Sequence, residues 1–122
     1  MGYVTPSGVA SVYDPADYIT SDYFEPKSFI GNIFKIGNAV FISCSAIRPS
    51  GIGFPVFSTL FTLAEGLRPK SEAKACGIAR STKSGAKVPA YINITTNGMV
   101  ILESNNDDMQ YDQVVFTASY IV

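Results

Sequence analysis

The stretch Ala39-Val-Phe-Ile-Ser-Cys-Ser-Ala-Ile47 decides the fold class of this chain. Its side chains alternate, so that Val40, Ile42, Cys44 and Ala46 share one face of the segment. Alternation with a period of two is typical of a β-strand with one buried face. Residues 28–36 form a second strand-like run, and Gly37-Asn38 separates the two runs. Because Gly-Asn suits turns that need positive φ, the pattern predicts a two-residue hairpin.

The same pattern continues toward the C-terminus. Residues 90–94 alternate, Thr96-Asn97-Gly98 supplies a turn, and residues 99–103 form the returning strand. Residues 71–80 are predicted as a strand of small side chains, followed by a polar loop. Residues 48–55 carry prolines and glycines, which favours a loop. Residues 114–122 alternate with two rather apolar faces, so we expect a strand covered by the core on one side and by a neighbouring subunit on the other.

These signals predict one all-β domain. A chain of 122 residues fits a single domain, and no boundary or repeat divides residues 1–122. We expect a jelly-roll-like β-sandwich or barrel of about eight antiparallel strands without significant helix. Residues 14–18 and 61–66 have room for single helical turns only. Residues 1–27 are expected to form an N-terminal arm or first strand.

The composition of the chain argues against several classes of binding partner. Charged residues make up 16% of the chain, below the roughly 25% usual for soluble proteins, and such a neutral surface suits an oligomer or a sugar-binding face. The net charge of −1 and the scattered basic residues predict no nucleic-acid binding. Every apolar run is too short for membrane insertion. Cys44 and Cys76 lack metal-site spacing and are interpreted as two buried reduced thiols, with a disulfide as the alternative.

The sequence also predicts no catalysis, no cofactor and no metal site. The chain has no histidine, and it lacks a nucleophile elbow, a P-loop and paired metal-ligand cysteines. A glycosidase-type carboxylate pair is the alternative, because glycoside hydrolysis needs only two suitably spaced acids. Its candidates are Glu103, Asp107, Asp108 and Asp112. Acidic residues in a polar loop are more often simply solvated, so we expect no enzyme.

The loop from Glu103 to Asp112 is the candidate ligand site. Sugar recognition needs planar amides and carboxylates for hydroxyl groups and an aromatic ring for the C–H face of the sugar. The candidate ligand-binding residues are Asn105, Asn106, Asp108, Gln110 and Tyr111 of this loop, together with Tyr91 and Arg48. A merely solubilising hairpin loop is the alternative. The aromatic and acidic segment from Tyr13 to Phe24 is a second candidate site or an arm that packs on a neighbouring subunit.

Four motifs follow one another in an order known from a protein family. They are Gly37-Asn38-Ala39-Val40, Leu63-Ala64-Glu65-Gly66-Leu67-Arg68-Pro69, Ile92-Asn93-Ile94-Thr95-Thr96-Asn97-Gly98-Met99-Val100 and Phe116-Thr117-Ala118-Ser119-Tyr120. Over residues 28–122 this order resembles the C-terminal receptor-binding head of bacteriophage tail-fibre and baseplate proteins. In the Leu63–Pro69 motif, Gly66 suits positive φ, and we expect a structural turn with a solvated Arg68. The alternative is that Arg68 holds loop carbonyls or reaches a carboxylate of another subunit.

The resemblance implies a function. It implies a jelly-roll-like homotrimer that binds host cell-wall or surface saccharide and attaches to other baseplate or tail proteins of the virion. Such a protein is made in the bacterial cytoplasm and ends at the tip of the phage tail. The alternative is a structural baseplate or tail-fibre assembly protein with protein partners only.

Overall fold

The computed structural model describes residues 4–5, 8–49, 52–104 and 110–122, and their structure is almost entirely β. The all-β class is therefore confirmed. The elements are β1 Val4–Thr5, β2 Gly8–Val9, β3 Ser11–Tyr13, α1 Pro15–Tyr18, β4 Ile19–Thr20, a 3-10 turn Pro26–Ser28, β5 Ile30–Ile36, β6 Ala39–Ile47, β7 Thr59–Leu63, β8 Ala73–Arg80, β9 Lys87–Ile94, β10 Met99–Ser104 and β11 Gln113–Ile121.

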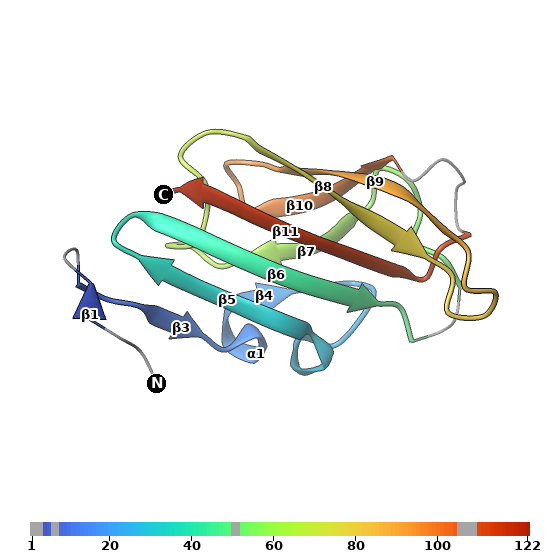
Figure 1. Cartoon of the computed structure of the whole chain (residues 1–122), viewed down its shortest axis with the longest axis horizontal. Coiled ribbons are helices and arrows are strands. Elements are labelled where there is room, and N and C mark those ends of the chain that lie inside the picture. Colours follow the sequence, from blue (N-terminus) through green and yellow to red (C-terminus); the bar gives the residue numbers. More distant parts are fainter. Residues whose placement is uncertain (1–3, 6–7, 50–51, 105–109) are drawn as a thin grey trace.

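Nine strands form one curled antiparallel sheet, a half-barrel, in the order β3-β5-β6-β11-β8-β9-β10-β7-β4 (Figure 1). The strands β1 and β2 pair separately with each other. Residues before 28 supply both edges of the large sheet, because β3 pairs with β5 and β4 pairs with β7. The rings of Tyr13 and Tyr18 meet edge to face at 4.8 Å and so connect the two edges through α1.

The predicted hairpins are confirmed. Ile36 pairs with Ala39 across a two-residue turn, in which Gly37 has φ 58°. The β9–β10 turn contains Gly98 at φ 86°, and the Thr95 N–H donates to the Met99 carbonyl at 3.0 Å. The residues of each turn therefore set the register of the β5–β6 and β9–β10 hairpins.

The core lies inside the curl of the sheet. Val40, Ile42, Cys44 and Ala46 are all buried, as the alternation predicted. Phe61 on β7 stacks on Phe116 of β11, with ring centroids 6.3 Å apart. The helical turn considered for residues 61–66 is wrong at its start, because Thr59–Leu63 is a strand paired with β10. Phe61 and Leu63 are buried there, so sheet packing decides the conformation.

Strand β11 lies in the interior of the sheet. It pairs with β6 along Gln113–Ile121 and with β8 over its first four residues. Val114, Phe116 and Tyr120 are buried, whereas Val115 and Ile121 are exposed on the opposite face. This opposite side of the sheet is called the outer face below.

The Leu63–Pro69 motif forms a turn held by side chains of two motifs. Gly66 adopts φ 96°, and the Arg68 Nε donates to the Leu63 carbonyl at 3.1 Å. The Tyr120 hydroxyl donates to the Leu67 carbonyl at 2.5 Å, so the end of β11 anchors this turn. Arg68 therefore holds a loop carbonyl, which was the alternative to the solvated side chain that the sequence favoured.

Both cysteines are free thiols, but only one is buried. Burial raises the pKa of the Cys44 thiol, as expected for a core residue. The prediction for Cys76 is wrong, because this residue is exposed. It occupies the outer side of β8 opposite Tyr91, where no second layer of the described structure covers the sheet. Among the described residues, no helix has the length and apolarity needed to cross a membrane.

Candidate functional site

The predicted ligand loop is only partly within the described structure. Asn105, Asn106 and Asp108 lie outside the described residues. Gln110 is exposed, as a ligand-binding amide should be. The prediction for Tyr111 is wrong, because its side chain belongs to the core and is only 3% exposed. Its ring is therefore not available to stack on a sugar.

Arg48 lies at the same end of the sheet as Tyr111 but takes part in a different arrangement. Its guanidinium lies 4.9 Å from the centre of the Tyr23 ring and donates to the Gly53 carbonyl at 2.9 Å. Both residues line a groove of about 480 Å³ with Asp22 and Glu25. The structure thus brings Arg48 to the segment that was the second candidate site, away from the loop side chains.

Asp112 is a structural anchor of this end of the sheet. Its carboxylate accepts hydrogen bonds from the Thr82 N–H at 2.8 Å and from the Thr82 hydroxyl at 2.5 Å. Burial raises the pKa of Asp112, but these hydrogen bonds and the charge of Lys83 outweigh burial, so the pKa lies below its ordinary value. The carboxylate therefore connects the β8–β9 loop to β11 and is not the solvated loop acid that the sequence suggested.

Tyr91 is the predicted site residue with an available aromatic ring. It lies on the outer side of β9, where it pairs with Cys76 of β8 and Ser104 of β10 and is 49% exposed. No hydrogen bond or ring contact connects Tyr91 to Arg48 within the described ranges. The predicted set therefore separates into two places.

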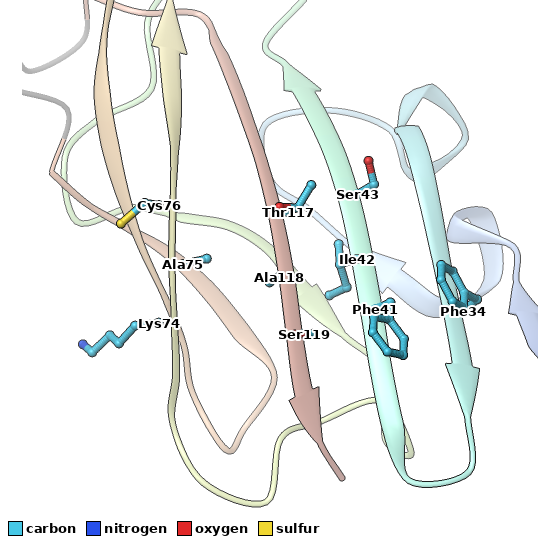
Figure 2. Close-up of a pocket in the computed structure, with 10 residues that line it drawn as sticks. All are labelled: Phe34, Phe41, Ile42, Ser43, Lys74, Ala75, Cys76, Thr117, Ala118 and Ser119. Carbon is cyan, nitrogen blue, oxygen red and sulfur yellow. The ribbon is translucent and has the colours of Figure 1, made fainter. Parts of the chain in front are cut away.

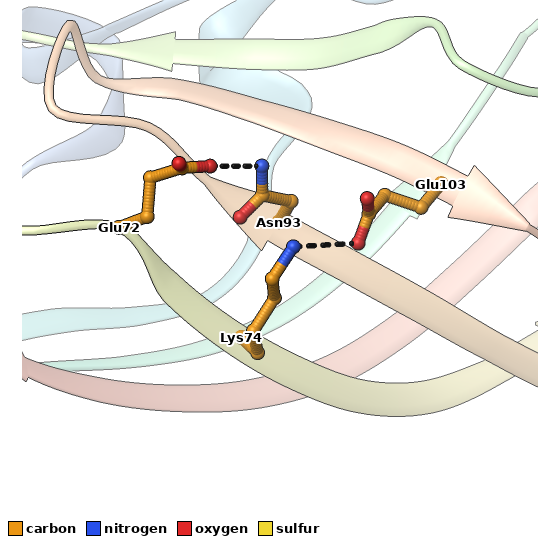
Figure 3. Close-up of polar contacts among 4 residues, drawn as sticks. All are labelled: Glu72, Lys74, Asn93 and Glu103. Atoms are coloured by element: carbon orange, nitrogen blue, oxygen red, sulfur yellow. Dashed lines mark hydrogen bonds and ion pairs between the residues drawn. The ribbon is translucent and has the colours of Figure 1, made fainter.

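Four polar side chains form two hydrogen-bonded pairs near Tyr91, on β9, on β10 and at the N-terminal end of β8, and their polar contacts are drawn in Figure 3. Asn93 follows two residues later on the same side of β9 and donates its Nδ2 to the Glu72 carboxylate at 2.6 Å. Lys74 pairs with Asn93 across β8 and β9, and its Nζ lies 3.1 Å from the Glu103 carboxylate of β10. We call Glu72, Lys74, Tyr91, Asn93 and Glu103 the Tyr91 cluster.

Asn93 is the most constrained member of the Tyr91 cluster. It is only 8% exposed, and its Oδ1 is buried without a hydrogen-bond partner among the described residues. In the reverse amide orientation, Oδ1 would face the Glu72 carboxylate, and two acceptors would repel each other. The carboxylate therefore keeps Nδ2 directed toward Glu72 and Oδ1 directed away from it. A buried acceptor without a donor costs about 1–3 kcal/mol, which a hydroxyl donor from a ligand would recover.

No protein-family model matches this chain, and a search of the curated proteins finds none similar to it. The geometry of the Tyr91 cluster is therefore the basis for a functional argument. Its exposed ring suits the C–H face of a sugar, and its two carboxylates, amide and ammonium suit hydroxyl groups. Within the described ranges, no group of three or more His, Cys, Asp or Glu side chains could hold a metal ion.

Sequence reasoning selected Tyr91 but missed Glu72, Lys74 and Asn93. The spacing Tyr91-x-Asn93 was the available signal, because residues two apart on a strand share a face. The contribution of Glu72 and Lys74 depends on the register between β8 and β9, in which Lys74 pairs with Asn93. A six-residue loop joins these strands, and no short turn motif specified that register.

Proposed function

We propose that this chain is a non-catalytic adhesion domain that binds a saccharide at the Tyr91 cluster. The observation that carries the proposal is the exposed Tyr91 ring beside an Asn93 amide whose Oδ1 has no donor among the described residues. An aromatic platform next to fixed planar polar groups is the chemistry that sugar recognition requires.

The polar side chains of the Tyr91 cluster have different roles in the proposed binding. Glu72 holds the Asn93 amide in one orientation, so this amide needs little ordering when a ligand arrives. Lys74 stands across from Asn93, and its side chain is 64% exposed. We expect the Lys74 side chain to move aside, giving a sugar hydroxyl access to Oδ1. Glu103 then remains as an acceptor for a neighbouring hydroxyl.

We further propose that the domain acts as a homotrimeric head on a phage tail or baseplate. The motif order over residues 28–122 supports this proposal, as does the low charge content of 16%. Outward apolar side chains lie on three of four neighbouring strands, namely Ile30 on β5, Val115 on β11 and Ile78 on β8, with Ser45 of β6 between Ile30 and Val115. A neighbouring subunit would cover such a patch, and three weak sites on one head would raise the avidity by orders of magnitude.

The same apolar side chains favour a second candidate function, an assembly domain with protein partners only. Ile30, Ile78 and Val115 are 57%, 48% and 39% exposed, and a protein partner that covers them suits either function. The two functions differ in the Tyr91 cluster, which an assembly protein has no need to keep accessible.

The test is a glycan-array screen of the purified domain, followed by titration of the best hit. Tyr91→Ala should weaken binding by at least about 10-fold, since stacking and its buried area are lost, whereas Tyr91→Phe should keep most of the affinity. Gln110→Ala is the matched control in the loop that the sequence favoured. An array without any hit, or equal affinity of Tyr91→Ala and wild type, overturns the proposed site.

Oligomeric state is measured separately by light scattering after size exclusion. A mass three times the 13.1 kDa of one chain supports the head. Ile78→Ser should then shift the population toward monomer, because it removes apolar area from the outer face. A wild-type monomer contradicts the trimer but leaves the saccharide proposal to the glycan array.

A further inference from the structure

A pocket opens in the outer face where two strands separate (Figure 2). The register between β11 and β8 ends at Phe116 and Gly77, but β11 continues to Ile121 along β6 and β8 begins at Ala73 along β9. The two strands therefore diverge beyond this pair. We call the resulting hollow, of about 560 Å³, the fork pocket.

The floor of the fork pocket is apolar. Ala75 of β8 and Ala118 of β11 line it from opposite sides together with Ile42 of β6. Both alanines are partly buried against the core. Because their side chains are single methyl groups, the floor can hold a small apolar group.

The rim of the fork pocket is aromatic on one side, where the rings of Phe34 and Phe41 stack at 5.0 Å, and otherwise mainly polar. The hydroxyl side chains of Thr117 and Ser119 on β11 and of Ser43 on β6 line one side, and Lys74 and Cys76 lie on the β8 side. Lys74 is also a member of the Tyr91 cluster, and Cys76 pairs with Tyr91. The pocket and the cluster are thus continuous across β8.

Backbone groups also face the fork pocket. The Lys70 N–H donates to the Ile121 carbonyl, whereas the Val122 N–H donates to the Asn38 carbonyl at the β6 side. Because peptide groups alternate along a strand, Ser119 directs its N–H and carbonyl toward β8, as Ile121 does. Ser119 lies three residues beyond Phe116, where the β8 register has ended. This position offers both a donor and an acceptor at the rim.

We propose that the fork pocket binds the acetamido group of an N-acetylated amino sugar whose ring rests against the Tyr91 cluster. The methyl group would lie between Ala75 and Ala118, and the amide would meet the peptide groups and hydroxyls of the rim. An acetamido group combines one methyl with one donor and one acceptor, which matches the floor and the rim together. The inference rests on the proposed saccharide function and narrows it to 2-acetamido sugars.

The test compares N-acetylglucosamine, N-acetylgalactosamine and N-acetylmannosamine with their parent hexoses, titrated into ¹⁵N,¹³C-labelled wild-type protein. A methyl group in a fitting apolar pocket changes affinity by roughly 10–200-fold, so at least one N-acetyl sugar should bind at least about 10-fold more tightly than its hexose. The methyl resonances of Ala75 and Ala118 should shift with the N-acetyl sugar and remain in place with the hexose.

A variant whose larger side chain fills the fork pocket provides the second part of the test. Ala118→Val should bring the ratio of the two affinities close to one while hexose binding at Tyr91 persists, and Ala75→Val is the replacement if the first variant fails to fold. Ala73→Val is the matched control, because Ala73 is on the same side of β8 but does not line the pocket.

The outcomes separate the two proposals. Hexose binding that depends on Tyr91, without any N-acetyl preference, overturns the fork-pocket inference and leaves the saccharide function in place. An N-acetyl preference that survives in Ala118→Val also overturns the inference. Absence of binding by every sugar, with an empty glycan array, overturns both.

Discussion

Gly77 and Phe116 form the last pair between β8 and β11, and a Cβ atom on Gly77 would overlap the Val115 carbonyl oxygen and the Phe116 Cβ. The absence of a side chain at Gly77 therefore allows the closest approach of the two strands. Immediately after this pair the strands separate and the fork pocket begins. Gly77 thus stands at the point where the pocket begins.

We predict that Gly77→Ala lowers the free energy of unfolding by about 1–3 kcal/mol, because the added methyl group meets backbone that cannot move without disturbing the pairing. Denaturant unfolding followed by circular dichroism measures the change. Ala79→Gly is the control on the same strand. It removes a buried methyl group where Gly77→Ala adds one, and it introduces no clash. A Gly77→Ala variant as stable as wild type would show that the two strands separate easily at this pair.

Gly31 should be more sensitive to substitution than Gly37. Gly31 adopts φ 135°, and a Cβ there would overlap the Ser43 carbonyl, whereas Gly37 adopts φ 58° in open space. We therefore expect Gly37→Ala to cost roughly 1–2 kcal/mol from backbone strain alone, and Gly31→Ala to cost about 2–5 kcal/mol. Thermal unfolding of both variants gives the comparison, and equal losses would contradict the clash with Ser43.

Stability should fall in acid partly through Asp112. Its pKa in the folded protein lies below the ordinary value, so the carboxylate contributes stability above the unfolded pKa of about 3.9. This contribution is lost as pH falls through the lower folded pKa. Unfolding measured between pH 7 and pH 2 should show a drop below about pH 4 that is smaller in Asp112→Asn. An equally large loss of stability below about pH 4 in Asp112→Asn would contradict the role of the Thr82 hydrogen bonds.

The two thiols should differ sharply in reactivity. Cys76 is exposed on the outer face, whereas Cys44 is buried and burial raises the pKa of its thiol. Because the thiolate is the reactive form, a disulfide reagent at pH 8 should label Cys76 within minutes and Cys44 only after unfolding. Cys76→Ser should abolish the fast phase. Two equally fast thiols would contradict the buried position of Cys44.

Labelling of Cys76 also reports on the candidate site, since Cys76 pairs with Tyr91 and lines the fork pocket. A saccharide bound at the Tyr91 cluster should slow the labelling. A bound sugar that leaves the rate unchanged would place the ligand elsewhere on the molecule.

The sequence by itself determined the all-β class, the alternation of β6 and β11, and the hairpins at Gly37-Asn38 and Asn97-Gly98. These features are local, because a period of two and a turn that needs positive φ are decided by residues within a few positions of one another. The same reasoning selected Tyr91 as an available ring, and the structure exposes it.

Only the tertiary structure decided which side chains meet. The interior position of β11 between β6 and β8 depends on pairings distant in sequence, and so does the alignment of Lys74 with Asn93. Tyr111 looked like a loop residue but is buried, and Cys76 looked like a core residue but is exposed. Such outcomes depend on which face another part of the chain covers, and an alternating pattern specifies two faces without naming the one that packs inward.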